Sequence, residues 1–250
     1  MKLKTIEGTV ALVTGSNRGI GRALTEELLE RGAKKVYATA RRPEQLDELV
    51  KRHRERIVPL AMDVTDPRSV ESVAQRSGDV QLLFNNAGVA GAAGLLAVEA
   101  TSTLRQEIEV NVVGTLNVTR AYADVLRSNG GGAVINIVSI AGLVNFPLFP
   151  TYSVSKAAAH SLTQALRLQL AAGGTQVIGV YPGPVDTDMA AGVPFEKSSP
   201  QEVAAAVLDG LLEGQSTIYP DPMARQFGTG WEASPRAAEL GVAQMASSAA

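Results

Sequence analysis

The sequence of 250 residues contains no cysteine, which excludes disulfides and thiolate metal sites. Aromatic residues make up only 4% of the chain, with one tryptophan and five tyrosines. The formal net charge of -2 leaves no excess of positive charge for a nucleic-acid surface. The densest basic run, between Lys51 and Arg56, follows an amphipathic pattern that is typical of a solvated helix face. We therefore expect no nucleic-acid partner.

Long hydrophobic runs are also lacking. The N-terminal stretch MKLKTIEGTV has no apolar segment of the kind that a signal peptide requires. The longest stretch without charge lies between Arg127 and Lys156, and glycines, asparagines and prolines interrupt it. Such a stretch fits a buried strand followed by a loop better than a membrane-spanning helix. We expect a cytoplasmic protein that does not contact the membrane.

Short apolar runs alternate with longer helical patterns along the chain. Most of the runs are continuously apolar, which is typical of strands buried on both faces of a parallel sheet. The intervening patterns favour βαβ units. The sequence thus predicts a single α/β domain with a doubly wound, mainly parallel seven-stranded sheet and helices on both faces. The strand candidates are residues 10–13, 36–39, 57–62, 80–84, 133–138, 177–181 and 217–219.

We assign residues 1–220 to a dinucleotide-binding and catalytic domain and residues 221–250 to a C-terminal extension. Met223, Phe227 and Trp231 recur every four residues, which predicts a helix over a pocket or a neighbouring subunit. The last ten residues have the composition of a frayed tail. The segment 183–200 is a long loop of the functional kind, in which Asp186 and Asp188 are interpreted as caps of a short helix.

A glycine-rich loop, TGSNRGIG, follows the first strand candidate and opens a helical pattern. Glycines 15, 19 and 21 allow a tight turn and a close approach of the backbone to a pyrophosphate, which the free N–H groups of a helix N-terminus then bind. The alternative is an ordinary glycine-rich turn. The position between a strand and a helix favours the phosphate site.

The second strand candidate ends in ATARR, where an NAD-binding fold would carry an acidic residue. This chain has Arg41 and Arg42 there, and Arg18 within the glycine loop. A guanidinium binds the 2′-phosphate of NADP, so we expect NADP(H) as the cofactor. The alternative, which is stronger for Arg42, is that the arginines only cap the strand in solvent.

Tyr152 and Lys156 lie four residues apart in a stretch with no other charge. In a helix they share one face. A nearby ammonium lowers the pKa of a phenol and makes it a usable acid or base near neutral pH. Alone, Tyr152 could equally be a buried aromatic residue with a bonded hydroxyl.

The set of motifs resembles the short-chain dehydrogenases/reductases. The motifs are TGSNRGIG at 14–21, NNAG at 85–88, Asn111, Ser139, YSVSK at 152–156 and PGPVDTDM at 182–189. The resemblance implies a Rossmann fold, hydride transfer with a nicotinamide cofactor, a homo-oligomer (dimer or tetramer) and a catalytic group of Asn111, Ser139, Tyr152 and Lys156. In that family the matching asparagine leaves a backbone carbonyl free to order a water. Taken singly, Ser139 is a strand-end cap and Asn111 a helix kink.

The expected cofactor contacts combine the glycine loop with the ends of later strands. They are Gly15, Ser16, Asn17, Arg18, Gly19, Ile20, Gly21, Arg41, Asp63, Val64, Asn86, Ala87, Gly88, Tyr152, Lys156, Pro182, Gly183, Val185 and Thr187. No cluster of His, Asp and Glu has the spacing of a metal site.

Two nearly charge-free segments, 140–150 and 189–195, should enclose the substrate. They predict a carbonyl reductase acting on an apolar or aromatic ketone or aldehyde, or on the secondary alcohol in reverse. Two alternatives stay open: an NAD-dependent alcohol dehydrogenase and a non-catalytic NADP(H)-sensing protein.

Overall fold

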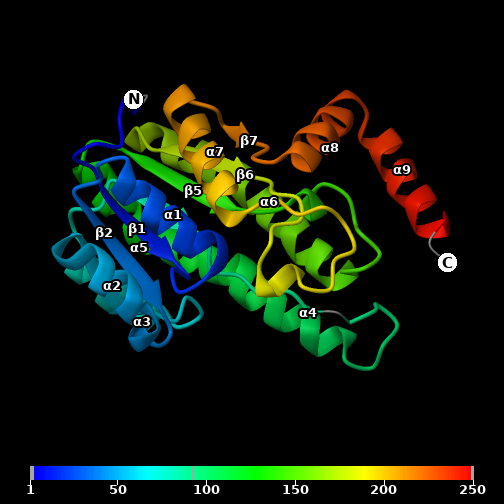
Figure 1. Cartoon of the computed structure of the whole chain (residues 1–250), viewed down its shortest axis with the longest axis horizontal. Coiled ribbons are helices and arrows are strands. Elements are labelled where there is room, and N and C mark those ends of the chain that lie inside the picture. Colours follow the sequence, from blue (N-terminus) through cyan, green and yellow to red (C-terminus); the bar gives the residue numbers. More distant parts are fainter. Residues whose placement is uncertain (1–2, 92, 249–250) are drawn as a thin grey trace.

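The computed structural model describes residues 3–91 and 93–248. Its seven strands form one sheet in the order β3-β2-β1-β4-β5-β6-β7, and every strand pair is parallel (Figure 1). This confirms the predicted doubly wound sheet. The strands are β1 (Val10–Thr14), β2 (Lys35–Ala40), β3 (Ile57–Ala61), β4 (Leu82–Asn85), β5 (Ala133–Ile137), β6 (Gln176–Val180) and β7 (Thr217–Ile218).

The continuous apolar runs are strands because both faces of the sheet are covered. In β1 all five residues are buried, and the side chains of the first four alternate between two hydrophobic clusters. Ala11 and Val13 belong to one cluster, whereas Val10 and Leu12 belong to the other. Period-2 alternation between two apolar layers explains why these four residues are all apolar.

Helices form a layer on each face of the sheet (Figure 1). The cluster with Ala11 and Val13 includes apolar side chains of α1 (Gly19–Glu30), α2 (Asp47–His53) and α7 (Pro200–Glu213). The cluster with Val10 and Leu12 includes side chains of α3 (Pro67–Arg76), α5 (Thr115–Ser128) and α6 (Pro150–Leu170). Short 3-10 segments lie at Pro43–Leu46, Arg54–Arg56, Ile140–Gly142, Ala171–Gly173 and Asp188–Ala190.

Between α4 (Ala100–Ile108) and α5 the helix is wound as a π-helix over Glu109–Gly114. This is the interruption predicted at Asn111, which lies within it. A π-segment adds one residue to a turn and commonly marks a functional position. Its last residue, Gly114, packs closely against Val64, because a Cβ at that position would lie 2.6 Å from a Val64 methyl group.

The C-terminal extension forms α8 (Pro222–Ala233) and α9 (Pro235–Ser248). The spacing of Met223, Phe227 and Trp231 correctly predicts α8. Where the sequence predicts a frayed tail, the structure is helical as far as Ser248, because this segment is rich in strong helix formers. Figure 1 shows α9 leaving the body of the molecule beyond α8. Residues 249–250 lie outside the described part.

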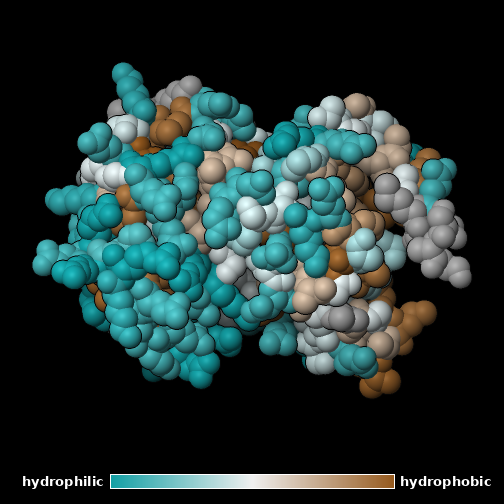
Figure 2. Space-filling view, in the orientation of Figure 1, coloured by the Kyte–Doolittle hydropathy of each residue, from teal (hydrophilic) through white to brown (hydrophobic). Residues whose placement is uncertain are grey.

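Hydrophilic residues cover the surface around α2 and α3, on the left of Figure 2. Hydrophobic colour gathers at the lower right, where the segment before α4 exposes Leu95, Leu96 and Val98. Within the described ranges, no helix has both the length and the apolar character that crossing a bilayer demands.

Candidate active site

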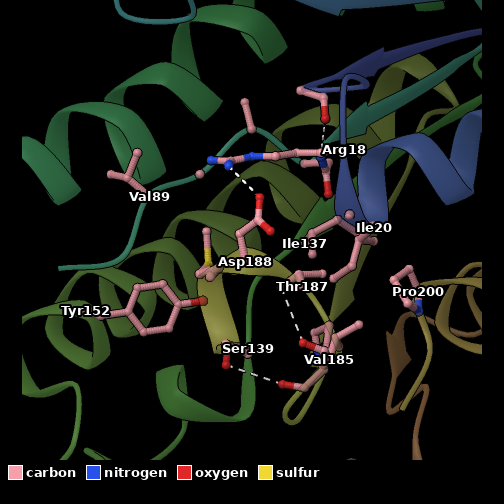
Figure 3. Close-up of a pocket in the computed structure, with 18 of the residues that line it drawn as sticks. Arg18, Ile20, Val89, Ile137, Ser139, Tyr152, Val185, Thr187, Asp188 and Pro200 are labelled. Atoms are coloured by element: carbon pink, nitrogen blue, oxygen red, sulfur yellow. Dashed lines mark hydrogen bonds and ion pairs between the residues drawn. The ribbon is translucent and has the colours of Figure 1, made fainter. Parts of the chain in front are cut away.

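A cavity of about 850 Å³ opens at the carboxyl ends of the strands. Parallel strands place these ends along one edge, and ligands bind where the strand order reverses, here between β1 and β4. Figure 3 shows residues from the glycine loop, the end of β5, α6 and the loop after β6 around this space. One half of the cavity is therefore formed by the glycine loop, and the other half by segments expected to enclose a substrate.

The glycine loop leaves room for an anion at the start of α1. Gly15 and Gly19 have φ angles of 68° and 53°, in the left-handed region that favours glycine. A Cβ at Gly21 would overlap the carbonyl oxygen of Gly15. Arg18 precedes α1 without making a side-chain cap, so no side chain at the cap position satisfies the first N–H groups of the helix. These features fit a pyrophosphate.

The NNAG segment is fixed to this loop by hydrogen bonds. The hydroxyl of Thr14 accepts from the backbone N–H groups of Asn86 and Ala87, each at 2.9 Å. The amide of Asn86 donates to the carbonyl oxygens of Thr14 at 2.8 Å and Gly15 at 3.2 Å. Asn86, Ala87 and Gly88 consequently line the cavity, as predicted.

Most of the predicted glycine-loop residues line the cavity, but two do not. Asn17, Arg18 and Ile20 face it, and Asn17 also donates to Gln45 at 3.2 Å. Ser16 is fully buried, and its hydroxyl donates to the carbonyl of Val13 at 2.8 Å. Ser16 and Gly21 thus shape the loop from behind, in contrast to the predicted direct contact.

The arginines differ in their surroundings. Arg41 is exposed and lines the cavity, whereas Arg42 does not line it. Arg18 forms an ion pair with Asp188 at 2.8 Å, which Figure 3 shows spanning the site. The interpretation of Asp188 as a helix cap is therefore wrong. Thr187 precedes the short helix without capping it, and the carboxylate of Asp188 pairs with Arg18 instead.

After β3, Asp63 and Val64 reach the cavity, as predicted. The carboxylate of Asp63 accepts hydrogen bonds from the backbone N–H of Thr65 at 2.9 Å and from its hydroxyl at 2.7 Å. The carbonyl of Val64 accepts from Asn117 at 3.2 Å. These bonds hold the turn after β3 in place.

Helix α6 brings Tyr152 and Lys156 to the cavity wall. Figure 3 shows the phenol of Tyr152 pointing into the cavity. The Nζ atom of Lys156 donates to the carbonyl oxygen of Ile137 at 2.9 Å and lies 5.5 Å from the centre of the Tyr152 ring. Ser139, at the end of β5, donates to the carbonyl of Pro182 at 3.3 Å and accepts from the N–H of Ala141 at 3.1 Å.

The electrostatics differ from the prediction that Lys156 lowers the pKa of Tyr152. Burial raises the pKa of the Tyr152 phenol, whereas the neighbouring Ser139 hydroxyl acts on that pKa in the lowering direction. Burial also lowers the pKa of Lys156 to about 8. The reason is that the same apolar enclosure desolvates both groups, which disfavours the phenolate and the ammonium alike.

Asn111 is buried and does not line the cavity. Its amide donates to the carbonyl of Val89 and to the hydroxyl of Ser155, and its side-chain oxygen accepts from the N–H of Val89, each at 2.9 Å. Its own backbone carbonyl accepts from the hydroxyl of Thr115 at 3.0 Å. Asn111 therefore joins the segment after β4 to α6.

The loop after β6 brings Pro182, Gly183, Val185 and Thr187 to the cavity, as predicted. The hydroxyl of Thr187 donates to the carbonyl of Val185 at 3.3 Å. The remaining wall is mostly apolar. It contains Ile140, Phe146, Leu148, Phe149, Met189, Val193, Phe195 and Met223.

Sequence reasoning missed one buried carboxylate beside this loop. Asp221 is 2% exposed and accepts from the backbone N–H of Gly183 at 2.8 Å. The available signal was the dipeptide Asp221-Pro222 after the last strand, because Asp at the N-cap and Pro at the first helical position begin a helix. That signal predicts the cap but not the contact with Gly183.

Comparisons with known proteins identify the family of the chain. The short chain dehydrogenase family matches residues 9–197. An uncharacterized oxidoreductase of Staphylococcus saprophyticus is 33% identical over 221 residues, which are 83% of this chain and 93% of that protein.

Two solved structures have the same fold. A short chain dehydrogenase from Burkholderia cenocepacia, in complex with NADP, has a TM-score of 0.89 and 42% identity over 95% of this chain and 98% of that chain. A short chain dehydrogenase/reductase from Burkholderia phymatum, in complex with NAD, has a TM-score of 0.81 and 25% identity, covering 94% of each chain. With a family match over most of its length, the chain belongs to the short chain dehydrogenases and is an oxidoreductase of that family.

Proposed function

We propose that this protein is an NADP(H)-dependent carbonyl reductase. It transfers hydride reversibly between the nicotinamide and an apolar or aromatic ketone, aldehyde or secondary alcohol. The observation that carries the proposal is the meeting of Tyr152, Ser139 and Lys156 in one cavity, between a phosphate-type loop and an apolar wall. The predicted cytoplasmic location and assembly into a dimer or tetramer remain part of this proposal.

The cofactor would lie along the glycine loop and the segments after β4 and β6. The bound nicotinamide supplies the hydride donor or acceptor. Gly15 and Gly19 keep the loop clear of side chains, and the first N–H groups of α1 bind the pyrophosphate. A Cβ placed on Gly88 would lie 3.2 Å from the side-chain oxygen of Asn111, so this position also favours a residue without a side chain.

The preference for NADP(H) rests on Arg41 and Arg18. Both line the cavity. Strand β2 ends at Ala40, and Arg41 follows at the position where an NAD-binding fold carries an acidic residue. Arg41 is exposed, and among the described residues no carboxylate pairs with it, so its guanidinium is available to a phosphate. The 42% identical structure from Burkholderia cenocepacia is a complex with NADP, which supports this choice. The 25% identical structure from Burkholderia phymatum is a complex with NAD, which is the alternative cofactor.

Tyr152 acts as the general acid in reduction. Because burial raises its pKa, the phenol holds its proton at neutral pH and can give it to a carbonyl oxygen that is gaining an electron pair. When substrate binds, the hydroxyl of Ser139 turns its hydrogen from the Pro182 carbonyl to this oxygen and orients it. Lys156, held by the carbonyl of Ile137, places a titratable amine behind the phenol.

The substrate class follows from the wall. Phe146, Phe149 and Met223 surround the space beside Tyr152 and Ser139, and the Phe146 and Phe227 rings pack with their centres 5.5 Å apart. An apolar wall binds aryl or alkyl groups by burying their surface, and it offers no cation to a phosphate or carboxylate.

A carbonyl and alcohol panel with NADPH and NADH tests the proposal. We expect turnover of aryl ketones and aldehydes, faster with NADPH than with NADH, and poor turnover of sugar phosphates. Rapid turnover of a phosphorylated sugar with no activity on aryl ketones contradicts the substrate class. NADPH binding seen by fluorescence, without oxidation by any carbonyl compound of the panel, favours the sensing protein instead.

A further inference from the structure

A single peptide group joins Ser139 to the C-terminal extension. Its carbonyl, on Pro182, accepts from the N–H of Ile140 at 3.1 Å and from the hydroxyl of Ser139 at 3.3 Å. Its N–H, on Gly183, donates to the carboxylate of Asp221 at 2.8 Å. The two sides of one peptide plane are thus bonded to a predicted catalytic residue and to a buried carboxylate.

The second oxygen of Asp221 holds α8. It accepts from the backbone N–H of Ala224 at 2.8 Å, which caps the helix. The next residues of α8 reach the substrate half of the cavity. Met223 lines the cavity, and Phe227 packs against Phe146. One carboxylate therefore fixes both the Ser139 side and the apolar wall.

The environment of Asp221 suits a charged group that must stay in place. The residue is 2% exposed, and burying an ionised carboxylate is costly unless hydrogen bonds compensate it. Both oxygens accept a backbone N–H, and such charge-assisted bonds are short and strong. Gly183 permits the approach, because a Cβ there would lie 2.9 Å from the carboxylate.

A charged acceptor on the N–H also strengthens the carbonyl on the other side of the same peptide, because linked hydrogen bonds polarise one another. The Pro182 carbonyl, which accepts from the hydroxyl of Ser139 in the absence of substrate, then keeps the serine oxygen at a fixed place at the end of β5. Building on the proposed function, we propose that Asp221 is a positioning residue that fixes Ser139 through the Pro182–Gly183 peptide and aligns it with the substrate wall on α8.

Two variants separate the hydrogen bond between Gly183 and Asp221 from the capping of α8 by Asp221. Asp221→Ser keeps a good capping residue but is too short and has too few acceptors to serve both N–H groups. Asp221→Asn keeps the shape, removes the charge and replaces one of the two acceptor oxygens by an NH2 group, which cannot accept from an N–H. The matched control is Asp66→Ser, which alters the equivalent cap of α3, where Asp66 accepts from the N–H of Arg68 at 3.0 Å and does not itself line the cavity.

We expect kcat for aryl ketones to fall by about 10- to 100-fold in Asp221→Ser, because small displacements of a positioned group are costly. We expect a fall in Asp221→Asn as well and none in Asp66→Ser. NADPH affinity, measured by fluorescence, should change far less than kcat. KM should rise for ketones large enough to reach α8 and stay unchanged for small ones, whereas a merely structural role would reduce the active fraction and leave KM unaltered.

Hydrogen exchange tests the same link without turnover. NADPH should increase the protection of the α8 amides in the wild type and in Asp66→Ser, and this increase should be lost in Asp221→Ser. If the wild type reduces no carbonyl compound but shows this difference, the proposed function fails and the link through Asp221 stands. Wild-type kcat together with unchanged NADPH-dependent protection in Asp221→Ser and Asp221→Asn overturns the proposal.

Discussion

The ammonium nitrogen of Lys156 lies 5.5 Å from the centre of the Tyr152 ring, and its hydrogen bond goes to the carbonyl of Ile137. The two residues share a face of α6, as their spacing predicts, but the lysine is fixed to the end of β5 and not to the phenol. Burial is therefore the main influence on the pKa of both side chains. It keeps the phenol protonated and brings the pKa of the amine down to about 8.

Tyr152→Phe should remove the acid and leave the cavity shape unchanged. We expect kcat to fall by about 100-fold or more, the usual scale for a general acid, with little change in NADPH affinity. Steady-state kinetics and fluorescence titration measure the two effects. Tyr37→Phe is the matched control, because its hydroxyl bonds to Lys35 and Asp79 away from the cavity. Equal losses of activity in the two variants would mean that the phenol of Tyr152 has no chemical role.

The depressed pKa of Lys156 predicts a pH dependence of stability. Between its folded pKa of about 8 and its usual value of 10.5, the unfolded state binds more protons than the folded state. The free energy of unfolding therefore rises with pH through this window, as a penalty that is fully present below pH 8 disappears.

Comparison with Lys156→Met isolates this contribution. Relative to this variant, the wild type should gain up to about 3 kcal/mol in unfolding free energy between pH 7 and 10, as measured by urea denaturation of the cofactor-free protein. Parallel curves for the two proteins would show that the amine is not desolvated.

Arg41→Ala should weaken NADPH binding and leave NADH binding unchanged. We expect about tenfold weaker NADPH binding, which corresponds to the loss of one charge-assisted contact of about 1.5 kcal/mol. Fluorescence titration with both cofactors measures the difference. Arg42→Ala is the control, because the neighbouring arginine does not line the cavity. If Arg42→Ala has the larger effect on NADPH, the assignment of the phosphate contact is wrong.

Gly21→Ala should destabilise the fold, because the added Cβ would overlap the carbonyl of Gly15. Overpacking of this kind costs about 1–3 kcal/mol, and it should also weaken binding of either cofactor. Gly78→Ala is the control, since a Cβ there meets nothing within 4 Å. Thermal unfolding of the two variants provides the comparison, and an equal effect would refute the close-packing argument.

The fold could be predicted because its signals are local. The strands are continuous apolar runs, and the helix of the extension is visible in the spacing of Met223, Phe227 and Trp231. The Ser, Tyr and Lys positions follow from spacing and from the rule that strand ends bind ligands. The helical structure of residues 241–248 could not be predicted, because small residues such as alanine and serine are common both in frayed tails and in helices. Composition alone therefore does not distinguish the two.

Features that depend on distant pairs could not be predicted. The ion pair between Arg18 and Asp188 joins residues 170 positions apart, and the bond between Gly183 and Asp221 joins residues 38 apart. The pKa of Tyr152 depends on how completely the surrounding segments exclude water, which no single motif encodes. Likewise, the inward hydroxyl of Ser16 depends on the exact path of β1 beneath the loop.

The π-helical turn at Glu109–Gly114 changes the rotation between α4 and α5, so the two halves of this long helix can pack on different neighbours. Helix α4 packs on α6, whereas α5 contacts α3, β4 and β5 in addition to α6. Deleting one residue from this turn would rotate one half relative to the other by about 100°, the angle of one α-helical residue. Either Asn111 would lose its hydrogen bonds to Val89 and Ser155, or the apolar face of α5 would no longer pack on the sheet. The extra residue thus sets the rotation of α4 relative to α5. We therefore expect the fold to tolerate most side-chain substitutions in this turn better than a change in its length.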